Sequence, residues 1–269
     1  MVLVWEHQPV YTLGRGADER HLTFLQHDAD RLALSRKNRQ GARLSVDPRS
    51  HLDPLGHGSS LDAAVRQLVA VTSPTTTVYA PNGAPVYRVE RGGEVTWHGP
   101  GQVVVYPLLD LQRPPMQADL HWYLRQVEQV IIDVLQEEYD ITGVRDDINT
   151  GVWVDECKIA AVGVNASRWI TTHGLALNVQ PDMARYFDTN VLLPCGVPGR
   201  GVTSVAQILE ARGQADRIPT VTQVADALLH KMEQVFGIHR LGETLIESDD
   251  GCGSEDELEE EMGTNQAIE

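Results

Sequence analysis

Cysteine and lysine are scarce in this chain of 269 residues, which has three of each. Three unevenly placed cysteines without a CxxC pair argue against a disulfide-stabilised scaffold and against a structural zinc site. No apolar run approaches the ~20 residues of a membrane-spanning helix. Residues 1–5 are too few for a signal peptide, and no basic, acid-poor leader precedes them. We therefore expect a soluble, intracellular protein.

Positive charge is also scarce: the chain has 22 Lys and Arg but 38 Asp and Glu, which gives a net charge of −16. Residues 247–269 hold ten of the acidic residues and no basic one, which leaves −6 for the rest of the chain. Such a terminal charge run is typical of a disordered, solvated tail. A charge this negative argues against nucleic acid as a general partner.

An apolar content of 42% supports a proper core, and the length suits one large domain over residues 1–246. Residues 28–84 differ in character, because they mix Arg, His, Ser, Pro and Gly. We interpret them as a long inserted loop that contains one short helix capped by Ser60. The histidines in or near this loop show no metal-ligand spacing, and we interpret them as surface residues: His21, His27, His51 and His57.

Hydrophobic periodicity predicts three helices in the second part of the chain. Residues 119–139 carry one apolar stripe behind Asp119, which can cap a helix. A short helix follows Ser204 and ends near Gly213. A last helix begins at Thr220 or Thr222 and ends at Gly237. Short apolar runs predict strands at 1–13, 85–90, 103–111, 152–154, 158–164, 169–172 and 175–179. Residues 103–111 are apolar enough for a central strand.

Residues 151–205 carry the most informative chemistry. Cys195 follows the apolar segment 191–193 and sits between a proline and a glycine, so a turn at a strand end displays its thiol. Lys158 opens a short apolar run that suits a tightly packed strand. If these side chains meet, the ammonium holds the thiol as thiolate. Cys157 would face away from any site that Lys158 faces. The alternative is that Cys195 is a small buried apolar residue.

A glycine-rich loop joins the predicted strands 85–90 and 103–111. Glycines at 92, 93, 99 and 101 permit positive φ and a close approach of a ligand to the backbone. Exposed amide N–H groups beside Arg91 and His98 would suit a carbonyl or phosphate oxygen. An ordinary hairpin with glycine-rich turns is the alternative. The spacing matches neither a P-loop nor a dinucleotide-binding loop.

Several stretches match a known family in order and spacing: EHQPVYTLGRG, RGGEVTWHGPGQ, GVWVDECKIAAVG, HGLALNV, and LLPCGV followed by TSV. On these motifs the chain resembles the lipoyl(octanoyl) transferases. DLHWYLRQVEQVIIDVL and SRWITTHGLALNV are most similar to the plastid and cyanobacterial branch. Two features depart from the family. The chain begins almost at EHQPVYTLGRG, before which the family has a further strand and helix, and the insertion at 28–84 is longer than usual.

The resemblance implies an α/β fold with a mixed sheet flanked by helices, as in the biotin and lipoate protein ligases. It implies transfer of an octanoyl or lipoyl group from acyl carrier protein to a lysine on a lipoyl domain. That domain would belong to a 2-oxoacid dehydrogenase or a glycine-cleavage protein. No metal, nucleotide or redox cofactor would be required. The compartment would be the plastid or mitochondrion in a eukaryote and the cytoplasm in a bacterium.

The resemblance also implies roles for particular residues. Cys195 matches the cysteine that forms the acyl thioester, and Lys158 matches the lysine that lowers its pKa. The small residues near Lys158 would leave room for an alkyl chain. The matching substrate-binding stretches are Arg91, Gly92, Gly93, Glu94, Val95, Thr96, Trp97 and His98, then Ala161, Val162 and Gly163, then Gly174, Leu175 and Ala176.

Two other classes of function fit parts of the sequence. One is an ATP-dependent lipoate or biotin ligase of the same fold, which needs no catalytic cysteine. The other is a non-catalytic protein that binds acyl carrier protein. Acyl carrier proteins are generally acidic, and this chain is acidic as well. A transferase would therefore need a local basic patch to bind its carrier. We expect some of the arginines in or beside the motifs at the mouth of the site, with Arg168 and Arg200 first: Arg88, Arg91, Arg113, Arg168, Arg185 and Arg200.

Overall fold

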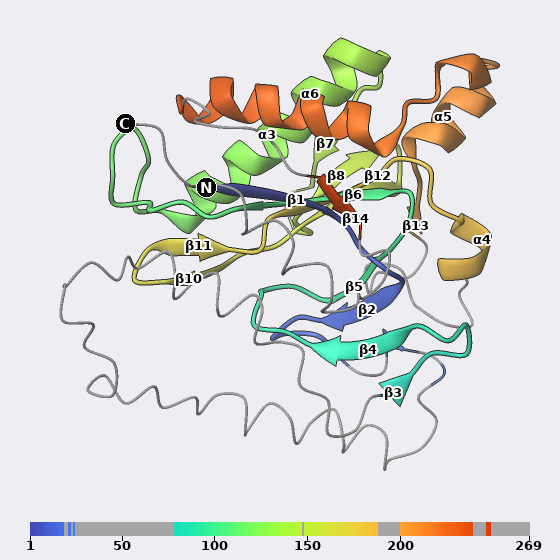
Figure 1. Cartoon of the computed structure of the whole chain (residues 1–269), viewed down its shortest axis with the longest axis horizontal. Coiled ribbons are helices and arrows are strands. Elements are labelled where there is room, and N and C mark those ends of the chain that lie inside the picture. The colour runs from blue at the N-terminus through green and yellow to red at the C-terminus, as the bar shows by residue number, and fades with distance from the viewer. Residues whose placement is uncertain are drawn as a thin grey trace, which may run out of the picture.

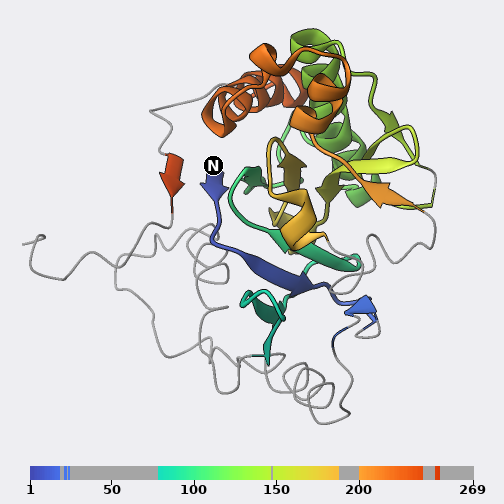
Figure 2. The same cartoon turned by 90° about the vertical axis from the view of Figure 1, so that its right-hand side faces the viewer.

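A mixed β-sheet carries helices on one face and a smaller sheet on the other (Figures 1 and 2). The computed structural model describes residues 1–18, 21–22, 24, 78–146, 148–187, 200–238 and 246–248. Within these ranges eight strands form the main sheet, in the order β14, β1, β6, β12, β9, β8 and β7, with β13 beside β9. Their bounds are Ile246–Ser248, Val2–Glu6, Gln102–Pro107, Leu175–Asn178, Cys157–Val162, Val152–Val154, Val144–Arg145 and, for β13, Gly201–Val202.

The smaller sheet has the order β3, β4, β2 and β5 among the described residues. Its strands are Val78–Tyr79, Pro85–Arg88, Val10–Leu13 and Val95–His98. A separate two-stranded ribbon consists of β10 (Asn165–Ser167) and β11 (Ile170–Thr172). The helices are α3 (Leu120–Tyr139), α4 (Met183–Tyr186), α5 (Val205–Ala211) and α6 (Val221–Phe236), with a 3-10 turn, η4, at Ala215–Arg217.

The predicted central strand is confirmed as β6. It pairs antiparallel with β1 on one side and with β12 on the other, and its valines are buried. The strand ends at Pro107, earlier than the predicted 103–111. A strand buried on both faces needs apolar residues at consecutive positions rather than an alternating pattern, which is why VVV occupies its middle. The predicted mixed sheet flanked by helices is therefore confirmed.

The predicted helix ends are also confirmed. The Asp119 carboxylate accepts hydrogen bonds from the backbone N–H groups of His121 and Trp122 and so caps α3. Thr220 and Gln223 form a reciprocal capping box at the start of α6. Gly237 ends α6 in the left-handed conformation, with φ of 61°. The apolar sides of α3 and α6 pack on the main sheet and form the larger of two hydrophobic cores.

Among the described residues, the chain passes between the two sheets at two places. Residues 7–9 join β1 of the main sheet to β2 of the smaller sheet, and residues 99–101 join β5 to β6. A hydrogen bond from backbone to side chain ties the crossings together, because Gly101 N donates to a carboxylate oxygen of Glu6 at 2.7 Å. The prediction of one strand over 1–13 was wrong, since Pro9 cannot donate to a ladder and disfavours continuation. Strand β5, within the predicted glycine-rich loop, was missed.

Two predicted boundaries differ from the structure. The end of the expected insertion, residues 78–84, lies in the smaller sheet, where β3 pairs with β4 and Ala80 and Ala84 are buried. The backbone of residues 246–248 forms β14 parallel to β1, so the sheet reaches two residues into the expected tail. The helix predicted behind Ser60 lies outside the described residues. No helix in the described part of the chain is long and apolar enough to cross a membrane.

Candidate active site

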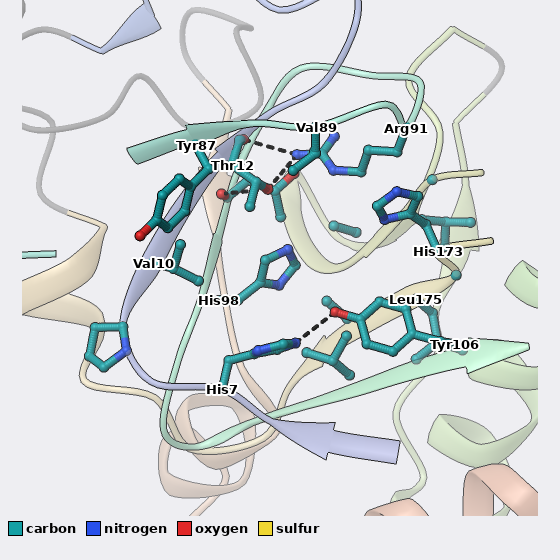
Figure 3. A pocket seen from close by; sticks show the side chains of 18 of the residues that line it. His7, Val10, Thr12, Tyr87, Val89, Arg91, His98, Tyr106, His173 and Leu175 are labelled. Atoms are coloured by element: carbon teal, nitrogen blue, oxygen red, sulfur yellow. Dashed lines mark hydrogen bonds between the residues drawn. The ribbon is translucent and has the colours of Figure 1, made fainter. Parts of the chain in front are cut away.

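A largely apolar cavity of about 370 Å³ lies between the main sheet and the smaller sheet (Figure 3). Its floor includes a cross-strand row of Val104, Ala176 and Ala161, because Ala176 of β12 pairs with Val104 of β6 and with Ala161 of β9. The alanines leave open the space that larger side chains would fill. The predicted site residues that line this apolar cavity are Arg91, Thr96, His98, Ala161, Val162, Gly163, Gly174, Leu175 and Ala176.

A second cavity of about 260 Å³ adjoins the first, and we call it the lysine cavity because Lys158 lines it. The two cavities share four lining residues: Arg91, Thr96, Ala161 and Val162. Further predicted residues on its wall are Gly93, Glu94, Val95 and Trp97. Gly92 lines neither cavity, and its N–H donates to the carbonyl of Val164. The residues drawn from three separate motifs thus meet at one composite site, although their roles stay predictions.

Arg91 organises the loop that separates the two cavities. Its side chain is buried, and one terminal nitrogen donates to the carbonyls of Gly92 and Glu94 at 3.1 and 2.9 Å. The other donates to the carbonyl and hydroxyl of Thr12 on β2 at 2.9 and 2.8 Å (Figure 3). Burial lowers the pKa of Arg91 to about 10, so the guanidinium stays charged at neutral pH. These four bonds join loop and sheet, and a direct bond from Arg91 to substrate stays a prediction.

His98 projects from β5 into the apolar cavity (Figure 3). Its Nδ1 lies 2.9 Å from the side-chain oxygen of Gln102, which is buried at the start of β6. Burial lowers the pKa of His98 from 6.5 to about 3, and the positive charge of Arg91 acts in the same direction. The imidazole is therefore neutral at neutral pH.

Three further polar side chains on the wall of the apolar cavity were missed from sequence. His7 Nε2 lies 2.6 Å from the hydroxyl of Tyr106, and burial raises the pKa of that hydroxyl above its usual range. Burial lowers the pKa of His173 to about 4. Metal-binding geometry is absent from these histidines: the described residues contain no cluster of three or more His, Cys, Asp or Glu that could hold an ion. His21, considered above, instead contacts the Glu94 carboxylate at 3.0 Å.

Lys158 lies over the face of Trp153, with its ammonium nitrogen 4.8 Å from the ring centroid. In the part of the chain that the structure describes, no carboxylate pairs with this ammonium. Arg200 also lies over the Trp153 ring, at 4.7 Å, and forms ion pairs with Asp146 and Glu156. A lysine without a carboxylate partner in a cavity is able to stabilise an anion brought by a substrate or by another part of the chain.

The two cysteines of the central stretch are placed differently. Cys157 is partly buried and lines neither cavity, and a side chain on Gly201 would clash with its sulfur. This agrees with the prediction that Cys157 faces away from Lys158. Cys195 lies outside the described residues. Phe187 and Val202, on either side of residues 188–199, both line the lysine cavity, and Val202 pairs directly with Lys158.

Comparison with known proteins agrees with this geometry. The model of the lipoyl protein ligase A/B catalytic domain matches residues 75–233. An octanoyltransferase from Gloeobacter violaceus is 36% identical over 238 residues, which cover 88% of this chain and 76% of that protein. One from Nostoc punctiforme is 54% identical over 165 residues, covering 61% and 63% of the two chains. A chloroplastic octanoyltransferase of Arabidopsis thaliana is 44% identical over 165 residues, covering 60% and 57%.

Solved structures share the fold at low sequence identity. Lipoate-protein ligase A bound with ATP has a TM-score of 0.52 at 13% identity, over 91% of this chain and 75% of that one. A Thermoplasma acidophilum protein assigned as a lipoate protein ligase has a TM-score of 0.51 at 11% identity, over 92% and 74%. The chain spans between 57% and 64% of the first curated relatives that it matches. The predicted ligase-like fold and the resemblance to octanoyltransferases are confirmed, and the chain belongs to the lipoyl protein ligase A/B catalytic-domain family.

Proposed function

We propose that the protein transfers an octanoyl or lipoyl group from acyl carrier protein to a lysine on a lipoyl domain. The observation that carries this proposal is the adjacency of two unlike cavities. One is largely apolar with a floor of small residues, which suits an eight-carbon chain, and the other holds Lys158. The names of the relatives, which are octanoyltransferases, support the same reaction.

The proposed reaction has two acyl transfers. In the first, the Cys195 thiolate attacks the carbonyl carbon of the octanoyl thioester, and the carrier thiolate leaves from the tetrahedral intermediate. In the second, the neutral amine of the acceptor lysine attacks the enzyme thioester, forms the amide, and expels the Cys195 thiolate. Lys158 favours the Cys195 thiolate as a cationic neighbour in the first transfer, and it then gives its proton to the departing carrier thiolate. The neutral amine that remains takes the proton that the acceptor ammonium must lose before the second transfer.

The fold supports the pairing of Lys158 with the segment that contains Cys195. Thr203 N donates to the carbonyl of Lys158 at 3.0 Å, so the chain after residue 199 runs directly beside β9. Phe187, before the segment, lies on the wall of the same cavity. Described residues on both sides of the segment 188–199, namely Phe187 and Val202, therefore line the lysine cavity.

The plastid relative supports a plastid location for a chain of this type from a eukaryote. A mitochondrial location in a eukaryote and a cytoplasmic one in a bacterium stay part of the proposal. The acyl donor and the protein acceptor follow from the reaction: an octanoyl thioester on acyl carrier protein, and a lysine amine on a lipoyl domain. Neither partner involves nucleic acid or a membrane.

Mixing the full chain with octanoyl-acyl carrier protein tests the proposal directly. Intact-mass measurement should show one octanoyl adduct, and peptide mapping should place it on Cys195. Addition of a lipoyl domain should then discharge the adduct. An adduct on Cys157, or none under turnover conditions, contradicts the assignment. Ligation of free octanoate that requires ATP and survives Cys195→Ala would establish a ligase instead. Slow alkylation of Cys195 at neutral pH, without any adduct, would favour a non-catalytic carrier-binding protein.

Replacement of Lys158 tests its role as the cationic neighbour. Lys158→Ala should raise the pKa of the Cys195 thiol, because the positive charge that favours the thiolate is removed. The measurement is the rate of thiol alkylation as a function of pH. The matched control is Lys231→Ala, whose side chain pairs with Glu137 on the helical layer. An unchanged titration curve in Lys158→Ala would separate the two residues and remove the dyad.

A further inference from the structure

Gln102 has an orientation that backbone groups dictate. Its side chain is 2% exposed, and its amide nitrogen lies 3.2 Å from the carbonyl oxygen of Trp97. A carbonyl oxygen only accepts hydrogen bonds, so the nitrogen, and not the oxygen, of this amide must face Trp97. The same nitrogen donates to the side-chain oxygen of Asn178 at 2.8 Å. Asn178 is fixed in turn, because its own amide nitrogen donates to the carbonyl of Thr203 at 3.0 Å.

This orientation decides which nitrogen of His98 carries the proton. The side-chain oxygen of Gln102 faces Nδ1 of His98 at 2.9 Å. Because that oxygen can only accept, Nδ1 must be the donor. A neutral imidazole has a single N–H, so Nε2 carries a lone pair and is an acceptor. The burial that holds the pKa of His98 near 3 keeps the ring neutral. The tautomer is set by a series of hydrogen bonds that begins at two backbone carbonyls.

The acceptor nitrogen is left for a ligand. His98 lines the apolar cavity, and no group in the described ranges forms a hydrogen bond to its Nε2. An alkyl chain offers no donor to this nitrogen. The two substrates of the proposed reaction do offer donors. The pantetheine arm of the carrier has amide N–H groups, and the acceptor lysine has amine N–H groups. In the proposed reaction both groups reach the reacting carbonyl, which we place beside the residues that the two cavities share.

We propose that Gln102 is a positioning residue that holds His98 in the Nδ1–H tautomer, so that Nε2 accepts a hydrogen bond from an N–H group of the substrate. The tautomer follows from the contacts within the protein alone. The identity of the N–H donor rests on the proposed function. Gln102 also lines the lysine cavity, but in this proposal it acts through His98.

The tautomer is measured on the full chain by 15N NMR of the histidine rings, with His98→Asn used to assign the signal. The wild type should show a protonated Nδ1 and an unprotonated Nε2 on His98 at neutral pH. In Gln102→Met, which has a similar volume and no acceptor oxygen, the proton should redistribute to Nε2. Asn178→Ala is the matched control, because Trp97 still orients Gln102 and the wild-type tautomer should persist. The His173 signal should stay unchanged in both variants.

A wild-type spectrum with the proton on Nε2, or with a charged ring, overturns the inference without any variant. The same holds if Gln102→Met folds and keeps the wild-type tautomer. This readout does not depend on catalysis, so a failure of the proposed function leaves the assignment of the tautomer tested on its own.

The contact with substrate is tested by single-turnover rates of the two transfers in Gln102→Met. Asn178→Ala is the comparison, because it also alters the wall of the lysine cavity but should keep the wild-type tautomer. Loss of one hydrogen bond of ordinary strength should slow the affected transfer about tenfold. Slower loading from octanoyl-carrier, with normal discharge, identifies the pantetheine amide as the donor. Slower discharge to the lipoyl domain, with normal loading, identifies the acceptor lysine. Unchanged rates for both transfers, in a variant whose tautomer has shifted, overturn the substrate contact while the octanoyl transfer itself stands.

Discussion

Two buried histidines in the apolar cavity should make the stability of the fold depend on pH. The pKa values of His98 and His173 fall from 6.5 to about 3 and about 4, mainly because burial disfavours the charged ring. Between pH 6.5 and 4 the unfolded chain therefore binds more protons than the folded chain. The free energy of unfolding should decrease as the pH falls through this window, by up to ~1.4 kcal/mol per pH unit for each histidine.

Urea unfolding at several pH values between 7 and 4.5 measures this slope. His98→Asn and His173→Asn should each reduce it, because each removes one titrating group. His121→Asn is the matched control, since His121 is exposed on α3 and its replacement should leave the slope as it is. If neither cavity variant changes the pH dependence, the two rings are not buried as neutral groups.

Under the proposed function, the floor of the apolar cavity should set the length of the acyl chain that the protein accepts. Ala176 lies in the middle of the row formed with Val104 and Ala161. Ala176→Leu adds three carbon atoms to a cavity of about 370 Å³, so the preference should move from octanoyl to shorter thioesters. Comparison of kcat/KM for butanoyl, hexanoyl and octanoyl thioesters provides the measurement. Ala166→Leu, on β10 outside both cavities, is the control, and an equal change for all chain lengths would contradict the prediction.

At the scale of elements, a buried carboxylate on α3 holds the loop that lines the lysine cavity. Glu128 is 1% exposed and pairs with Arg125 and Arg145 at 3.1 and 3.3 Å. It also accepts a hydrogen bond from Gly151 N at 3.0 Å, and residues 148–150 just before that glycine line the lysine cavity. Glu128→Ala should lower the free energy of unfolding by roughly 2–3 kcal/mol, because a buried N–H and two cations lose their partner.

Chemical denaturation measures this loss. The matched control is Glu137→Ala on the same helix, whose carboxylate is 55% exposed and pairs with Lys231. An exposed pair contributes about 0–1 kcal/mol. Equal losses in the two variants would mean that Glu128 does not anchor the loop.

The helices, the central strand and the strands β8 and β9 followed from local patterns, such as a cap at Asp119, a stop at Gly237 and an uninterrupted valine run. Those signals depend on neighbours within one turn or one strand. Strand β5 and the roles of His7, Tyr106 and Gln102 did not follow, because they depend on which strands pair across the fold. His7 and Tyr106 are 99 residues apart. His173 had only a weak signal, as a polar residue that interrupts two apolar runs.

At the scale of the whole molecule, the two arginines favoured for docking differ in their ion pairs to the described residues. Arg168 and Trp169 form the tip of the ribbon of β10 and β11, with φ values of 49° and 66°, and Trp169 is 38% exposed. No carboxylate in the described part of the chain pairs with Arg168. Arg200 is instead held by Asp146, Glu156 and Trp153. Arg168 is therefore the stronger candidate for a contact with an acidic carrier.

Arg168→Glu should raise the KM for octanoyl-carrier by roughly threefold to tenfold, because a charge at the rim of an interface is reversed. A small octanoyl thioester should be turned over at the wild-type rate. Arg200→Glu is the comparison, and it should impair both substrates because its ion pairs support the lysine cavity. Equal impairment of both substrates by Arg168→Glu would show that the ribbon supports the fold rather than docking.

The hydrogen bond between Gly101 and Glu6 ties together the two places where the chain crosses between the sheets. His7 and His98, which line the apolar cavity, lie at these same crossings. The width of the cavity is therefore set by the angle between the sheets, and a rotation of the smaller sheet moves both crossings at once. A substitution in the outer layer of the smaller sheet, distant from both cavities, should then change the choice of acyl chain and the rate of transfer in parallel. If acyl-chain selectivity changes without the rate in such a variant, the angle between the sheets does not control both.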